Sequence, residues 1–204
     1  MNVLCVQIDG ALPNLALMRL SSWHKSKGDN VFFSRSVSRD LFAPEYDVVY
    51  GSSIFKFSKE RIERFKQEYP NAILGGTGTE SKEVTETIIG DWNGVDYSGY
   101  KDFDASIGFT QRGCRLKCKF CVVPMKEGKN RSVNTIYDIW RGEGNPKKLH
   151  LLDNDFFGQE PEKWARRCQE MTTGKFKVCF SQGINVRLIN PAVCVALRNL
   201  DYRD

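Results

Sequence analysis

The sequence lacks the features that mark membrane, secreted and repetitive proteins. No uninterrupted apolar run approaches the ~20 residues that a membrane helix needs. The first nine residues have neither the basic stretch nor the small-residue cleavage site of a signal peptide. There is no low-complexity tract, and no internal repeat beyond an alternation of strand and helix patterns. These absences predict a cytoplasmic protein without a membrane partner.

Histidine is scarce and cysteine is unevenly placed. The chain has 2 histidines, His24 and His150, and 7 cysteines. An odd number of cysteines in a chain without an export signal argues against a disulfide framework. Four of them are scattered, whereas Cys114, Cys118 and Cys121 lie together. Residues 111–148, which include this cluster, hold ten Lys or Arg against three acidic residues, so the excess positive charge surrounds the clustered cysteines.

The rest of the composition is that of a globular protein. The chain has 204 residues, of which 41% are hydrophobic and 27% charged, and a mean hydropathy of -0.43. This length suits one large domain or two small ones. Folding at this size buries roughly 70% of the surface of the unfolded chain, which is enough for a sizeable core.

The first ninety residues alternate between strand and helix patterns. Short apolar and β-branched runs predict strands at residues 3–8, 31–33, 47–50 and 72–74. Apolar stripes predict helices at residues 13–27 and 58–69, the second with Ser58 as its N-cap. Strands separated by helices imply a parallel sheet, which binds ligands at the carboxyl ends of its strands. The predicted fold class is therefore α/β.

A second alternation follows a polar stretch that contains several glycines. We place the first domain at residues 1–90, a linker at 91–103 and a second part at 104–204. In the second part, strands are predicted at residues 104–109, 149–152 and 176–180, and helices at 133–140, 161–171 and 191–200. Pro161 suits the first position of its helix.

The cysteine cluster has the spacing C-x3-C-x2-C, which admits three interpretations. On a helix, the three side chains would share one face and could simply be core residues. Gly113 and the basic residues between the cysteines favour a loop instead. A zinc site usually has four protein ligands in paired halves, and no second pair lies downstream. Three thiolates could hold a 4Fe–4S cluster with one open iron, and basic surroundings would lower thiol pKa values and offset the charge of the cluster.

The residues around the cluster resemble the signature of radical S-adenosylmethionine (radical SAM) enzymes. The resemblance rests on Arg112 and Gly113 before the first cysteine and on Phe120 before the last. It implies that Cys114, Cys118 and Cys121 hold a 4Fe–4S cluster on the loop after the first barrel strand. The open iron would bind S-adenosyl-L-methionine, and an electron donor would be needed for cleavage to a 5′-deoxyadenosyl radical that attacks an unknown substrate. Phe120 would lie near the adenine.

The resemblance extends to the first domain and to the length of the chain. Gly75-Gly76-Thr77-Gly78 after a strand is similar to the subclass with an N-terminal cobalamin-binding-like domain. That subclass implies a Rossmann-like sheet followed by a partial (β/α)6 barrel, with cobalamin as a candidate cofactor. The usual cobalt-ligating histidine is missing, since Asp9 is followed by Gly10 and no nearby histidine. Three strand–helix pairs are only the first half of such a barrel, so a longer, C-terminally truncated protein is expected.

The family also suggests residues that would contact the methionine part of the cofactor. Asp153, Asn154 and Asp155 occupy the place of a polar motif after the second barrel strand, where a carboxylate or amide could accept hydrogen bonds from an ammonium. A plain capping turn is the alternative. Arg187 follows the third strand and could pair with the carboxylate, or could simply face solvent.

Substrate and partner are less well indicated than the cofactors. The basic stretch 126–131 would suit an anionic substrate or a nucleic acid, but it has few aromatic residues for base stacking and is equally typical of a solvated loop. The alternative to a radical SAM enzyme is a non-catalytic zinc-binding or nucleic-acid-binding module.

Overall fold

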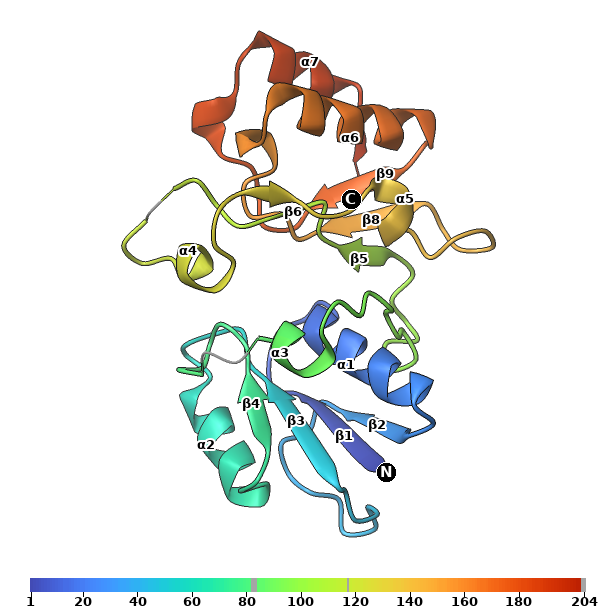
Figure 1. The fold of residues 1–204 in the computed structure, drawn as a ribbon, viewed down its shortest axis with the longest axis vertical. Helices are drawn as coiled ribbons and strands as arrows, with labels where there is room; N and C mark the ends of the chain where they lie inside the picture. The colour runs from blue at the N-terminus through green and yellow to red at the C-terminus, as the bar shows by residue number, and fades with distance from the viewer. Residues whose placement is uncertain (82–83, 117, 203–204) are drawn as a thin grey trace. The chain divides into compact units, whose positions relative to one another are not determined.

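The chain forms two compact units. The computed structural model describes residues 1–81, 84–116 and 118–202, and the units comprise residues 1–103 and 104–204 (Figure 1). Each unit contains its own four-stranded parallel sheet, so the α/β class predicted from the sequence is confirmed. The two units are described separately below.

The first unit is a parallel sheet with strand order β2-β1-β3-β4. Its strands are β1 (Asn2–Gln7), β2 (Asn30–Ser34), β3 (Val48–Ser52) and β4 (Ile73–Gly75). Its helices are α1 (Leu15–Ser26), α2 (Lys59–Glu68) and α3 (Glu86–Ile89). β1 is central, with Val3 paired to Val31 on one side and to Val48 on the other. Successive strands are thus added outward from β1 on one side and outward from β3 on the other, so the carboxyl ends of β1 and β3 form the switch point of the sheet.

Side chains of β1 alternate between two cores because a strand points successive residues to opposite faces. Val3 and Cys5 pack with residues of α1 and α3, whereas Leu4 and Val6 pack with residues of α2. Helices thus cover both faces of the sheet. Gly51 permits the close approach of α2, because a Cβ atom there would lie 2.4 Å from the ring of Phe65.

Residues 91–103, which the sequence suggests as a linker, lie within the first unit. Tyr100 is buried, and its hydroxyl donates to Gln7 Oε1 at 2.5 Å and accepts from Asn14 N at 3.0 Å. The Trp92 carbonyl accepts from Nε and Nη2 of Arg19 in α1, at 3.2 and 2.7 Å, while Nη1 of the same side chain donates to Glu86. These contacts attach the segment to the ends of β1 and α1.

The second unit is a parallel sheet with strand order β10-β9-β8-β5. Its strands are β5 (Ser106–Gly108), β8 (Lys148–Leu151), β9 (Lys177–Phe180) and β10 (Asp201–Tyr202). Its main helices are α5 (Ile136–Ile139), α6 (Pro161–Thr173) and α7 (Pro191–Arg198), and 3-10 turns cover Phe156–Gly158 and Val186–Leu188. A short antiparallel hairpin of β6 (Gln111–Arg112) and β7 (Arg131–Ser132) flanks helix α4 (Val123–Lys126).

The core of the second unit lies on one face of its sheet. Leu149, Leu151 and Val178 point to this face and pack with residues of α5, α6 and α7. The strand register places Ile107, His150 and Cys179 on the opposite face, because Ile107 pairs with His150 and His150 with Cys179. One face of the sheet therefore carries the helices, and the other carries a mixed polar and apolar row.

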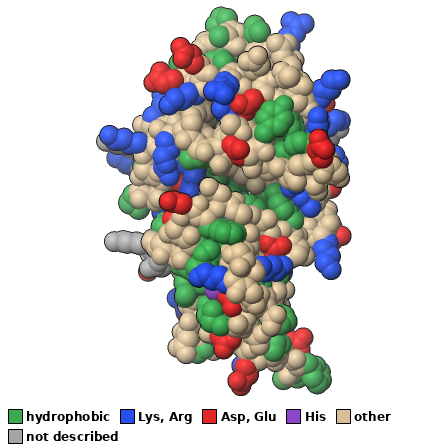
Figure 2. All heavy atoms as spheres, turned by 45° about the vertical axis from the view of Figure 1, so that its right-hand side comes forward, with side chains coloured by type: hydrophobic (Ala, Val, Ile, Leu, Met, Phe, Trp, Pro, Cys, Tyr) green, Lys and Arg blue, Asp and Glu red, His purple; other side chains and the backbone are tan. Residues whose placement is uncertain are grey.

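Charged side chains of both signs are spread over the face of the molecule drawn in Figure 2, with apolar side chains between them. None of the helices in the described ranges is both long and apolar enough to cross a membrane. The longest described helix, α6, has charged residues along its exposed side.

Candidate metal centre in the second unit

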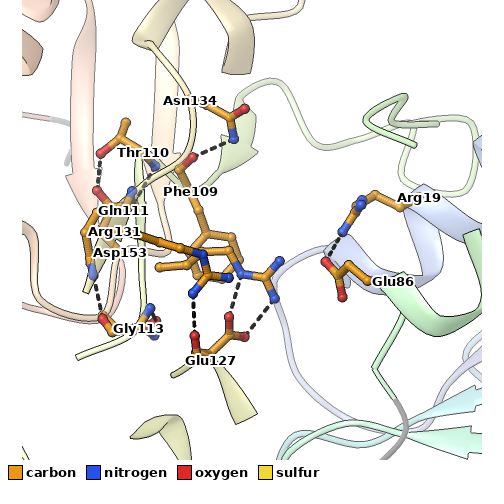
Figure 3. A network of polar contacts seen from close by, with 12 residues as sticks. Arg19, Glu86, Phe109, Thr110, Gln111, Gly113, Glu127, Arg131, Asn134 and Asp153 are labelled. Atoms are coloured by element: carbon orange, nitrogen blue, oxygen red, sulfur yellow. Dashed lines mark hydrogen bonds and ion pairs between the residues drawn. The ribbon is translucent and has the colours of Figure 1, made fainter. Parts of the chain in front are cut away.

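The cysteine cluster lies on a loop whose two ends are fastened together. The loop leaves the sheet after β5 and is closed by the β6–β7 hairpin, in which Arg112 pairs with Arg131. Arg112 also forms a bidentate ion pair with Glu127, with Nε at 2.5 Å and Nη2 at 2.9 Å from the two carboxylate oxygens. Arg131 donates to the Glu127 carbonyl (Figure 3). We call these contacts between 111–112, Glu127 and 131–132 the neck of the loop.

Gly113 is required where the loop leaves the neck. Its φ of +79° lies in the left-handed region that favours glycine. A Cβ atom there would lie 2.2 Å from the carbonyl oxygen of Lys129, so no larger residue fits. The next residue, Cys114, donates its N–H to the Gly128 carbonyl at 3.3 Å. The two ends of the loop therefore touch along their backbones just beyond the neck.

The three thiols are all free of disulfides and differ in exposure. Cys114 and Cys121 are half-buried, and Cys118 is exposed. Cys114 Sγ accepts from the N–H of Leu116 at 3.4 Å, and Cys121 donates its N–H to the Cys118 carbonyl at 3.0 Å. The loop favoured by the sequence is confirmed over the alternative of a helix with three core cysteines, because the described residues of this segment form bends and turns.

The electrostatics of Cys114 differ from the sequence expectation. The pKa of this thiol is raised, chiefly by burial and further by the charges of Asp155, Cys121 and Cys118, although the N–H of Leu116 opposes the rise. The expected lowering by basic neighbours is therefore wrong for Cys114. Burial is the main cause of the raised pKa, and two basic side chains of the loop are paired with acids, Arg112 with Glu127 and Arg115 with Asp155.

The donor set suits an iron–sulfur cluster by its chemistry. Thiolates are the ligands that such clusters use, and the fourth position on the cluster needs no protein side chain. In residues 1–81, 84–116 and 118–202, no three His, Cys, Asp or Glu side chains are already gathered as a metal site. Binding would therefore require the part of the loop beyond the neck to close around the metal.

Asp153, which follows β8, holds the first residues after β5. Its Oδ1 accepts from the N–H groups of Thr110 at 2.7 Å and Gln111 at 3.2 Å, and its Oδ2 accepts from the Thr110 hydroxyl (Figure 3). The side chain is 3% exposed. Burial raises the pKa of Asp153 to about 6, although its three hydrogen bonds oppose the rise. The carboxylate thus ties the chain between β5 and the cysteine loop to the neighbouring strand.

Asn154 and Asp155 extend the same connection toward the cysteines. Asn154 Oδ1 accepts from the N–H of Gly113 at 3.1 Å, directly before Cys114. The N–H of Asp155 donates to Gln111 Oε1 at 2.8 Å. Asp155 Oδ2 lies 3.1 Å from Arg115 Nε in an ion pair without hydrogen-bond geometry. Through these contacts the three polar residues hold the chain between β5 and the cysteines, a role that the sequence did not indicate. Their contact with a methionine ammonium stays a prediction.

The other two predicted cofactor residues are open to solvent. The Phe120 side chain is 87% exposed on the loop between Cys118 and Cys121. The Arg187 side chain is exposed in the 3-10 turn after β9, where its backbone N–H donates to Asn185 Oδ1 at 3.1 Å. Neither is brought into contact with Asp153, so the structure leaves both assignments as predictions.

The first unit does not supply a cobalt ligand at the switch point of its sheet. Asp9 follows β1 and accepts from Ser53 Oγ at 2.5 Å and from the N–H groups of Ile54 at 2.7 Å and Phe55 at 3.2 Å. These hydrogen bonds, together with one from the Ser58 hydroxyl, lower the pKa of Asp9 against the effect of burial. Asp9 thereby closes its own loop onto the one after β3.

The two histidines are committed elsewhere in their units. His24 is buried in α1, with Nδ1 at 2.7 Å from Asp29 and Nε2 at 3.0 Å from the Tyr50 hydroxyl. His150 lies on β8 of the second unit, with Nδ1 at 2.9 Å from Ser181 Oγ. The residues present therefore do not fit a histidine-ligated cobalamin.

The neck and the partners of Asp153 were not found from the sequence. Arg112 and Glu127 are fifteen positions apart, and Thr110 is 43 positions from Asp153. The only local signal was the basic character of the segment, which did not identify the acid that pairs with Arg112. No protein-family model matches the chain, and a search among curated proteins finds no match either.

Proposed function

We propose that the chain binds a 4Fe–4S cluster through Cys114, Cys118 and Cys121 and acts as a radical SAM enzyme. The observation that carries this proposal is the placement of the three free thiols. They lie on a necked loop at the carboxyl end of β5, which is the first strand of a parallel sheet. Ligand sites of parallel α/β proteins form at this end of the strands.

The arrangement of the second unit supports a partial barrel. All of α5, α6 and α7 contribute to one core on one face of the sheet, as helices on the outside of a barrel do. The opposite face, with Ile107, His150 and Cys179, would line the interior. The strand order of the first unit, β2-β1-β3-β4, supports a Rossmann-like domain of the flavodoxin-like type.

The side chains of this protein would bind and orient the cluster and S-adenosyl-L-methionine, and would not themselves take part in the bond cleavage. Cys114, Cys118 and Cys121 would hold the 4Fe–4S cluster, which would supply the electron for reductive cleavage of S-adenosyl-L-methionine. Asp153 and Asn154 fix the backbone from Thr110 to Gly113, which sets where Cys114 begins. Phe120 offers an exposed ring for the nucleoside, and Arg187 an exposed guanidinium for a carboxylate.

Anaerobic reconstitution tests the cluster. The chain is incubated with iron, sulfide and a thiol reductant, desalted, and analysed for bound iron and for the visible absorption of the cluster. We expect about four irons per chain, and we expect Ser in place of Cys114, Cys118 or Cys121 to abolish retention. Cys194→Ser is the matched control, because Cys194 is an exposed thiol on α7. One tightly held zinc without iron uptake, or equal loss in the control, would contradict the proposal.

A second measurement tests the enzyme activity. The reconstituted chain is reduced with dithionite in the presence of S-adenosyl-L-methionine, and 5′-deoxyadenosine is quantified by liquid chromatography. We expect formation that depends on all three cysteines. A chain that retains four irons but neither binds nor cleaves S-adenosyl-L-methionine would be an iron–sulfur protein of another kind.

A further inference from the structure

The first unit has a basic cleft that shares no residue with the candidate metal centre of the second unit. It has a volume of about 410 Å³ and lies between the segment that follows β2 and the first two turns of α2. Three arginines line it: Arg35 from the segment, and Arg61 and Arg64 from the helix. Glu60 is the only acidic residue of its described lining. The two helix arginines outnumber Glu60, so the cleft has a net positive charge.

The wall that carries Arg35 is held in one conformation. Ser34 Oγ accepts from the N–H of Ser36 at 2.9 Å, and Ser36 Oγ accepts from the N–H of Ser38 at 3.2 Å. These repeated local bonds make two consecutive turns. Val37, between them, is 7% exposed and packs into the core with residues of α2. Val37 thus fixes the segment to the core, while the neighbouring serine hydroxyls and Arg35 lie at the surface.

The helix wall is tied to the same segment. Arg61 Nη2 donates to the carbonyl oxygen of Arg35 at 3.2 Å, so the Arg61 guanidinium lies against the backbone of the opposite wall. Arg35 reaches the loop after β1, where its Nη2 donates to the Ala11 carbonyl at 3.2 Å. Arg35 Nη1 also donates to the Gly10 carbonyl at 3.5 Å, and its guanidinium lies over the Tyr100 ring, 5.7 Å from the ring centre, so this group is directed away from the cleft. Arg61 is oriented only through a neutral carbonyl oxygen, so its positive charge remains at the cleft.

Arg64 completes the positive field of the cleft. It lies three positions after Arg61, so the two guanidinium groups project from the same side of the helix. Like charges at this spacing repel each other. Among the described residues, none forms an ion pair or a hydrogen bond with the Arg64 side chain. A bound anion would relieve the repulsion and use the donors that the protein leaves unmatched.

We propose that this cleft binds a small phosphate-bearing ligand through Arg61 and Arg64. Guanidinium groups match phosphate oxygens in bidentate geometry, and two of them suit a dianion better than a monocarboxylate. The hydroxyl of Ser38 is an additional donor on the wall, whereas the Ser36 hydroxyl already donates to the Ser38 carbonyl at 3.2 Å. Among its described lining residues there is no aromatic side chain on which a base could stack, so a small ligand is favoured over single-stranded nucleic acid. This site is independent of the iron–sulfur proposal.

A titration with inorganic phosphate tests the site. The full chain, labelled with nitrogen-15, is titrated at constant ionic strength with sodium chloride as the balancing salt. We expect saturable shifts of the amide signals of residues 35–38, and we expect Arg64→Gln to weaken phosphate binding by about tenfold, as befits the loss of a charged hydrogen bond. Lys66→Gln is the matched control, because it removes the same charge from the same helix at a residue paired with Glu63.

Three results would overturn the proposal. The first is the absence of saturable shifts. The second is equal weakening by Lys66→Gln, which would indicate a general charge effect. The third is arginine-dependent binding of a single-stranded oligonucleotide by a chain that does not bind inorganic phosphate, which would assign the cleft to a nucleic-acid backbone instead. Arg64 is exposed, and the unchanged amide spectrum away from the cleft would show that the variant is folded.

Discussion

Replacing Asp153 with Asn removes a buried charge and keeps most of the shape that the charge occupies. The amide oxygen of the variant can still accept from the N–H groups of Thr110 and Gln111. The Thr110 hydroxyl, which donates to Oδ2 in the wild type, can rotate and accept from the new amide. The variant therefore tests the effect of the charge apart from the loss of the connection between the strands.

The magnitude follows from the pKa of Asp153, which rises from 3.8 to about 6 on folding. At ~1.4 kcal/mol per pKa unit, this is about 3 kcal/mol. Since the folded pKa is the higher one, the folded state binds the proton more tightly. The stabilisation is therefore fully present below pH 3.8 and is lost as the pH rises through about 6. Between pH 8 and pH 4.5, the wild type should gain about 2 kcal/mol relative to Asp153→Asn.

Urea unfolding of the metal-free chain, followed by tryptophan fluorescence at both pH values, measures this difference. The first unit is identical in both proteins, so its own pH dependence cancels. Asp153→Ala is the companion variant: it leaves three buried donors without an acceptor, and should lose about 3 kcal/mol or more at either pH. Identical pH dependence of the wild type and Asp153→Asn would refute the assignment of a buried, charged carboxylate.

Three further predictions concern the loop and the thiols. Gly113→Ala should weaken iron retention and lower the unfolding free energy by more than about 1 kcal/mol, because the new methyl group would meet the Lys129 carbonyl; unchanged iron content after reconstitution would contradict this. Phe120→Ala should keep both iron and thermal stability but weaken binding of S-adenosyl-L-methionine by ~1 kcal/mol, measured by calorimetry; an unchanged affinity would remove Phe120 from the site. In the metal-free chain, iodoacetamide should label the exposed Cys118 within minutes and leave Cys5 unlabelled, because burial raises the pKa of Cys5 to about 12; peptide mass spectrometry distinguishes the two, and early labelling of Cys5 would contradict its burial.

Much of the fold could be predicted because its signals are local. The buried apolar run near the N-terminus predicted β1 within one residue at each end, and Pro161 marked the first residue of α6. Such elements need only a short stretch of consistent pattern. Their parallel pairing followed from the alternation of strands and helices, which rules out simple hairpins.

Other features depended on contacts between distant residues. The helix predicted at 133–140 is only α5, Ile136–Ile139, because Thr135 and Asp138 form a capping box that starts it later. Ser58 precedes α2 but makes no side-chain capping bond, since its hydroxyl contributes to the surroundings of Asp9. Residues near Tyr100 looked like a linker because their burial against Gln7 cannot be inferred from local polarity.

In the candidate site, too, local sequence patterns were informative, whereas contacts between distant residues could not be predicted. The cysteine spacing alone identified the three candidate ligands, because metal sites concentrate their chemistry in a few side chains close in sequence. The supports of the loop could not be identified in this way. Asp153 was expected to face a ligand, yet its hydrogen-bond partners lie 43 and 42 positions away on the preceding strand segment. Sequence patterns give the type of an acceptor but not which donors will satisfy it.

The neck has a consequence for the order in which a metal centre could be assembled. Bringing distant chain segments together costs loop-closure entropy. The Arg112–Glu127 pair and the β6–β7 hairpin already close the loop in the metal-free chain, so metal binding does not have to offset this entropy. The metal then binds three thiols on a short loop whose ends are already joined. Binding to such a preorganised chelator is faster than binding to three independent ligands. Substitutions that break the contacts of the neck should therefore lower the rate of metal binding before they lower the stability of the sheet.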